Sequence, residues 1–133
     1  MRQTDLIMRL YSTYYSKEFT EALTRYMVAD FKNYSDFVDR YGSFPSDTPV
    51  KIAFQMVGTF YEGIGELLWK KLIDIELVED LFMVEVYWKK VEPLMEDLRK
   101  QFGSGLYEWF EYLYYEVKKR EQQIQLSKVQ ADG

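Results

Sequence analysis

The sequence predicts an all-α fold, a single-domain helical bundle of about five to six helices. Apolar residues recur at spacings of three and four along most of the chain, whereas the alternation typical of a β-strand is almost absent. Aromatic residues make up 18% of the 133 residues, and a large aromatic side chain removes about 150–250 Å² from water when it is buried. We therefore expect one helical domain over residues 1–126 and a disordered, polar tail over residues 127–133.

The N-terminal third predicts two or three helices. Thr4 and Ser16 are candidate N-caps, and each is followed by apolar residues at helical spacing. No glycine or proline separates these two segments, so the sequence leaves open whether they form one continuous helix. A further helix is expected from about Phe31 to Tyr41, and Gly42 is suited to end it.

A loop is expected over residues 43–49, where prolines, serines and an aspartate are concentrated. It ends in a helix start signal, because Asp47 or Thr48 can act as N-cap and Pro49 stands at or near the first helical position. The helix that follows is expected to reach about Leu72.

The C-terminal half predicts two more helices. Asp74 is a candidate N-cap for a helix that extends to about Phe102 and carries the most regular apolar stripe in the chain. Pro93 lies inside this stripe and is expected to kink the helix, because proline removes one backbone donor. A glycine-rich turn at residues 103–105 then leads into a last helix over about residues 106–126.

The composition excludes several classes of function. The chain contains no cysteine and no histidine, which removes thiol chemistry, Cys/His zinc sites and imidazole catalysis. Its net charge of −5 makes nucleic acid and anionic membrane surfaces poor partners, and no apolar run approaches the ~20 residues of a membrane span. We therefore expect a cytoplasmic protein without a cofactor, a metal ion or a catalytic residue.

Carboxylates are the common catalytic groups that the chain does contain in number. Clustered Glu and Asp side chains on facing helices can bind Mg²⁺, which prefers oxygen ligands. Most of these acids lie opposite the apolar stripes, which favours solvated helix faces over a metal site. The candidates are Glu62 and Glu66, then Glu92, Glu96 and Asp97, and finally Glu108 and Glu111.

Three glycines surround Glu62 within two helical turns. Each glycine inside a helix costs about 0.5–1 kcal/mol relative to alanine, so a close approach by a neighbour should compensate for them. Gly58, Glu62, Gly65 and Trp69 share one helix face, while Gly63 stands between them in sequence. Either a second helix or a ligand is expected to approach the backbone there.

Glu62 is expected to pair with Arg99, and Glu111 is a candidate to share that guanidinium. A bidentate arginine–carboxylate pair is the usual way to hold a carboxylate in a core. Two interpretations stay open: a structural ion pair at a helix crossing, which we favour, and a small polar pocket that recognises a ligand.

Aromatic residues surround the start of the last helix instead of forming one stripe. A helix that is apolar on all sides is either central in the fold or covered by a second chain, and Tyr and Trp are favoured at interfaces. We therefore predict that Trp109, Tyr112 and Tyr115 contact a second chain, either another copy in a homodimer or a different protein partner. Their aromatic neighbours are Tyr107, Phe110 and Tyr114.

Three phrases resemble a family of small helical proteins of prokaryotes that is catalogued only as a domain of unknown function. The resemblance covers about residues 50–117 and implies a helical fold, with Glu62, Trp88, Pro93, Arg99 and Glu111 as positions of interest. It implies no activity. In some relatives a membrane segment precedes the domain, and this sequence contains no such segment. The phrases are Phe60–Leu68 with Leu72-Ile73-Asp74, Trp88–Pro93 with Arg99, and Tyr107 with Phe110–Leu113.

Together these patterns favour a non-enzymatic helical interaction module that associates with itself through an aromatic surface. The alternative is a protein that binds a small ligand, or a magnesium-dependent enzyme, that uses the carboxylates around Glu62.

Overall fold

The computed structural model describes residues 2–45 and 48–132, and this part of the chain is helical without any strand. The predicted all-α fold is confirmed. Seven helices are present in the described residues, one more than the upper end of the predicted range. The additional helix arises because the long segment predicted after Asp74 is divided in two.

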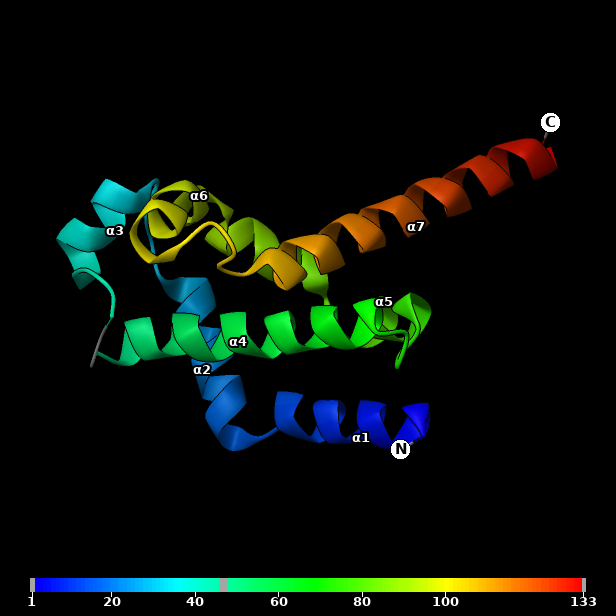
Figure 1. The fold of residues 1–133 in the computed structure, drawn as a ribbon, viewed down its shortest axis with the longest axis horizontal. Helices are drawn as coiled ribbons and strands as arrows, with labels where there is room; N and C mark the ends of the chain where they lie inside the picture. Colours follow the sequence, from blue (N-terminus) through cyan, green and yellow to red (C-terminus); the bar gives the residue numbers. More distant parts are fainter. Residues whose placement is uncertain (1, 46–47, 133) are drawn as a thin grey trace.

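The first two helices are separate, which answers the question that the sequence left open. Helix α1 spans Gln3–Tyr14 and helix α2 spans Lys17–Val28. The hydroxyl of Ser16 donates to the carbonyl of Thr13 at 2.7 Å and accepts the backbone N–H of Phe19 at 3.2 Å. One side chain thus ends α1 and caps α2, and the chain changes direction there (Figure 1).

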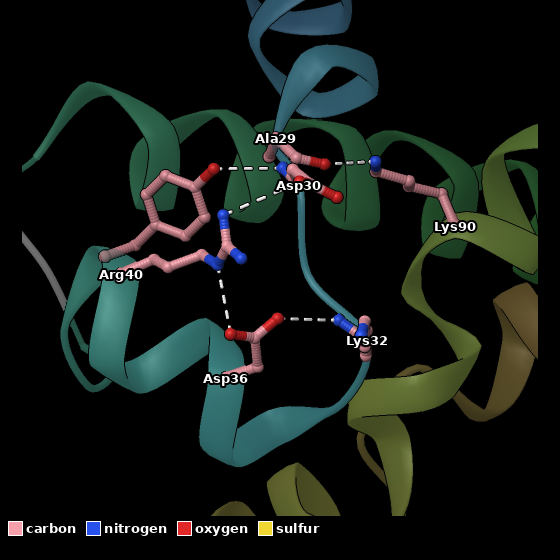
Figure 2. A network of polar contacts seen from close by, with 7 residues as sticks. Ala29, Asp30, Lys32, Asp36, Arg40 and Lys90 are labelled. Atoms are coloured by element: carbon pink, nitrogen blue, oxygen red, sulfur yellow. Dashed lines mark hydrogen bonds and ion pairs between the residues drawn. The ribbon is translucent and has the colours of Figure 1, made fainter.

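Helix α3 spans Tyr34–Tyr41 and starts three residues later than predicted, because the Asn33 side chain caps it by accepting the Asp36 N–H at 2.9 Å. Gly42 ends it with a φ of +90°, as predicted. Asp36 also accepts the backbone N–H of Lys32 at 2.9 Å and pairs with Arg40 at 3.0 Å. These contacts fix the link between α2 and α3 (Figure 2).

The same link is held to helix α6 (Val84–Phe102) by Lys90. Its ammonium group donates to the carbonyl of Ala29 (Figure 2) and to that of Met27 at 3.1 Å. Both carbonyls lie at the C-terminal end of α2, where a positive charge is favourable. Burial lowers the pKa of Lys90, and the charge of Asp30 opposes that shift. The ammonium also lies 5.0 Å from the centroid of the Phe31 ring.

Helix α4 spans Pro49–Trp69 and runs through the middle of the bundle. Helices α1 and α2 lie on one side of it, and α6 and α7 (Glu108–Asp132) lie on the other (Figure 1). Thr48 is its N-cap residue and Pro49 its first helical residue, as predicted. The alternative cap, Asp47, lies outside the described residues.

The prediction of a single helix from Asp74 to Phe102 is wrong. The structure has α5 over Ile75–Phe82 and α6 over Val84–Phe102, with Met83 between them in the left-handed conformation (φ 49°, ψ 47°). The hydroxyl of buried Tyr61 donates to the carbonyl of Phe82, which satisfies a backbone acceptor at the end of α5. Pro93 lies within α6, which continues through it.

Helix α5 is joined to α1 by a pair of amide hydrogen bonds. Asp74 precedes α5 as predicted, but its side chain makes no capping bond. Instead, Gln3 accepts the Asp74 backbone N–H at 2.5 Å and donates its amide N–H to the Asp74 carboxylate at 3.1 Å. These two bonds hold the first turn of α1 beside the residue that precedes α5.

Helix α7 spans Glu108–Asp132 and is longer than predicted. The expected disordered tail over 127–133 is helical as far as Asp132, and residue 133 lies outside the described residues. Residues 122–131 are exposed, and this part of α7 projects beyond the other helices (Figure 1). It makes no contribution to the core.

The core is built from stacked aromatic side chains. The Tyr61 ring stacks on Phe110 at 5.0 Å and on Tyr87 at 5.5 Å. The Tyr26 hydroxyl donates to the backbone carbonyl of Tyr87, and the Tyr14 and Tyr87 hydroxyls are 3.4 Å apart. The hydroxyls of Tyr14, Tyr26, Tyr61 and Tyr87 thus each have a polar partner, which offsets the cost of burying them.

Replacing Met83 by glycine is expected to raise the free energy of unfolding by about 0.5–1 kcal/mol, because glycine adopts positive φ without strain. The Met83 side chain is 55% exposed and contributes little to the core. Met56→Gly, in the interior of α4 at an exposed position, is the control and should lower stability by about 1 kcal/mol. Urea unfolding of both variants measures this, and a loss in Met83→Gly would contradict the assignment of strain.

Candidate functional site

The Glu62 carboxylate caps the N-terminus of α7. Its Oε1 atom accepts the backbone N–H of Phe110 at 2.8 Å, in the first turn of α7, where N–H groups lack partners within the helix. Burial raises the pKa of Glu62, and the N–H groups of Phe110 and Trp109 counteract that rise. A carboxylate from the middle of α4 therefore caps α7 in place of a local N-cap residue, across 48 positions of sequence.

Arg99 holds the loop that precedes α7. Its Nε atom donates to the carbonyl of Leu106 at 2.9 Å, and its Nη1 atom pairs with Glu111 at 3.2 Å. Nη2 is buried and has no hydrogen-bond partner. The guanidinium thus connects α6, the turn at 103–107 and the first turn of α7.

The predicted direct pair between Glu62 and Arg99 is wrong, although the pairing of Arg99 with Glu111 is present. In the described structure the Arg99 guanidinium is not within ion-pair distance of Glu62, and its charge is only a minor influence on the Glu62 pKa. The reason is that backbone N–H groups of α7 bind the Glu62 carboxylate, where the sequence predicted the Arg99 guanidinium. Glu62, Arg99 and Glu111 thus all stabilise the start of α7. Glu62 does so from α4, and Arg99 does so from α6 through Glu111 and Leu106.

Two of the three glycines in α4 explain how α7 comes so close. A Cβ atom at Gly65 would lie 2.0 Å from the carbonyl oxygen of Trp109, and one at Gly58 would lie 2.4 Å from the Tyr107 ring. The predicted close approach of a second helix is therefore confirmed. Gly63 has open space around it, and nothing in the structure explains that glycine.

The aromatic block of α7 is divided between core and surface. Phe110 and Tyr114 are buried, whereas Trp109 and Tyr112 are half-buried and pack on Trp69 of α4. The distance between ring centroids is 5.4 Å from Trp69 to Trp109 and 5.6 Å from Trp69 to Tyr112. We call Trp69, Trp109 and Tyr112 the Trp69 cluster.

The third predicted interface residue, Tyr115, lies apart from this cluster. It is 57% exposed and its ring packs on Tyr114. Trp69 was not predicted as an interface residue. Its position on the same helix face as Gly65 was a usable signal, because α7 contacts α4 at Gly65.

The carboxylates considered for a magnesium site do not come together. No group of three or more acidic side chains is placed to hold a metal ion among the described residues. Glu66 pairs with Lys70 at 3.1 Å, and Glu96 pairs with Lys100 at 3.4 Å. Glu92 accepts the indole N–H of Trp88 at 3.1 Å.

The helices of the described residues also include none with the length and hydropathy needed to cross a bilayer. The fold and site thus define a compact helical domain whose polar centre joins two crossing helices. The chain belongs to the family described as the domain of unknown function DUF4760, which matches residues 3–117. This confirms the resemblance and extends it from about residue 50 back to α1.

The family match ends before the projecting part of α7. No curated protein and no solved structure matches the chain.

Replacing Glu62 by alanine is expected to lower the free energy of unfolding by about 1–3 kcal/mol, because it leaves N–H groups at the start of α7 partly buried without an acceptor. Glu66→Ala, one turn further along α4 at an exposed ion pair, should change stability by less than about 0.5 kcal/mol. Guanidinium unfolding of the two variants tests this, and equal losses would show that Glu62 does not cap α7.

Proposed function

We propose that the chain is a non-enzymatic interaction module that associates with itself through the Trp69 cluster. The observation that carries this proposal is an aromatic side chain held in place but left open to solvent. Trp69 is 57% exposed, yet its ring is fixed against Trp109 and Tyr112. Tryptophan and tyrosine provide most of the binding energy in many protein interfaces.

The cluster is suited to association because its geometry is set before a partner arrives. Trp109 and Tyr112 lie in the capped first turns of α7 and contact each other edge to face at 5.8 Å. Side chains that are already ordered lose little conformational entropy on binding. A partner that covers Trp69 would remove a large apolar surface from water at a low ordering cost.

A second copy of the same chain is the partner that the surrounding charges favour. A two-fold interface brings one patch against itself, so the patch must be complementary to itself. Charges of both signs flank the cluster: Glu66 and Lys70 beside Trp69, and Glu116 and Lys119 beyond Tyr112. Burial and the negative charge of Glu116 raise the pKa of Tyr112, and the positive charge of Lys119 opposes that rise.

The alternative of a ligand site or a magnesium-dependent enzyme at Glu62 has less support, because the Glu62 carboxylate is already bonded to the α7 backbone. We place the protein in the cytoplasm because the chain contains no cysteine, as is common in reducing compartments.

Trp69→Ala is expected to weaken self-association at least tenfold, since a central interface tryptophan contributes about 2 kcal/mol or more. Tyr115→Ala is the matched control, because Tyr115 is also 57% exposed but lies outside the cluster. Sedimentation equilibrium of the full chain measures both dimerisation constants. A monomeric wild type at several hundred micromolar, or equal effects of the two substitutions, would overturn the proposal.

A further inference from the structure

An apolar cavity of about 230 Å³ lies near the N-terminal end of α4, away from the Trp69 cluster. Its walls come from the link between α3 and α4, from α4 and α6, and from the turn before α7. About 15 residues of α4 separate Phe54 in the cavity wall from Trp69, which corresponds to roughly 22 Å along the helix. The apolar walls are formed by Phe44, Pro45, Phe54, Val91, Leu98, Phe102 and Leu106.

Two uncharged polar side chains also line this cavity, Gln55 and Tyr107. Among the described residues, neither the Gln55 carboxamide nor the Tyr107 hydroxyl has a hydrogen-bond partner. The end of the Tyr107 ring lies against Gly58, one turn along α4 from Gln55. Both groups are therefore available to a molecule in the cavity.

The backbone of Tyr107 is strained in a way that positions this phenol. Its φ is +55°, which is unusual for a residue with a bulky side chain. Such strain persists only where the surroundings enforce it, and it is concentrated at functional positions. Here it is enforced by Arg99, which binds the carbonyl of Leu106, and by the capped start of α7.

Burial, aided by the nearby charge of Glu62, raises the pKa of Tyr107 to about 12. The phenol is therefore protonated at neutral pH and can both donate and accept a hydrogen bond. No charged side chain lines the cavity among the described residues, so these walls offer an ionic ligand no group of opposite charge, and a neutral ligand is favoured.

We propose that this cavity is a binding site for a small, neutral, monocyclic or bicyclic aromatic molecule that carries one hydrogen-bonding group. The ring occupies the space between the apolar side chains of α4 and α6, and its polar group bonds to Tyr107 or Gln55. The volume is sufficient, because a dry cavity of about 150 Å³ already takes up benzene. This site does not depend on the proposed self-association, since the two surfaces lie at different ends of α4.

The test uses para-cresol as the probe and para-toluate as its anionic counterpart of similar shape. In amide NMR spectra of the full chain, para-cresol is expected to shift the signals of Leu106, Tyr107 and Leu98 in a saturable way. Para-toluate at the same concentration should leave them unchanged. Shifts that map elsewhere, or equal shifts with the anion, would overturn the proposal.

Two variants sharpen this test. Leu106→Trp fills the cavity and should weaken para-cresol binding at least tenfold, whereas Leu126→Trp, on the exposed part of α7, should leave it unchanged. Tyr107→Phe keeps the ring, removes the hydroxyl and should weaken binding about three- to tenfold. Unchanged affinity in Leu106→Trp would contradict the site, and the wild-type map decides the question if that variant does not fold.

Discussion

The structure depends on the contact between the middle of α4 and the start of α7. A carboxylate at Glu62 supplies the acceptor that the first turn of α7 lacks, and Gly65 leaves room for the α7 backbone beside it. Neither feature is sufficient alone, because a helix end brought into a core without a hydrogen-bond partner is costly. Together they let a polar helix terminus lie against the most apolar helix of the bundle.

Both candidate binding surfaces follow from this contact. Tyr107 and Trp109 lie one residue on either side of Glu108, the first residue of α7. One of them lines the apolar cavity and the other belongs to the Trp69 cluster. The polar residues at the centre, Glu62 and Arg99, therefore position the aromatic groups and do not form a reaction site of their own. This explains why a chain without catalytic signatures keeps half-buried charges between two helices.

Much of the fold could be predicted from the sequence, because helical periodicity and local caps such as Ser16 are short-range signals. The division at Met83 could not, because a long-range hydrogen bond from Tyr61 helps to end α5 at Phe82. The glycines around Glu62 correctly indicated a close helix approach. The partner of Glu62 was missed, since backbone N–H groups leave no mark in a sequence, whereas a nearby arginine does.

The most direct test of the α4–α7 contact compares Gly65→Ala with Gly63→Ala, two identical substitutions two residues apart in one helix. At Gly65 the added methyl group would meet the α7 backbone, so we expect a loss of about 1–3 kcal/mol or more in the free energy of unfolding. At Gly63, which faces open space, the same change should stabilise by about 0.5–1 kcal/mol. Equal effects at the two positions in denaturant unfolding would contradict the account.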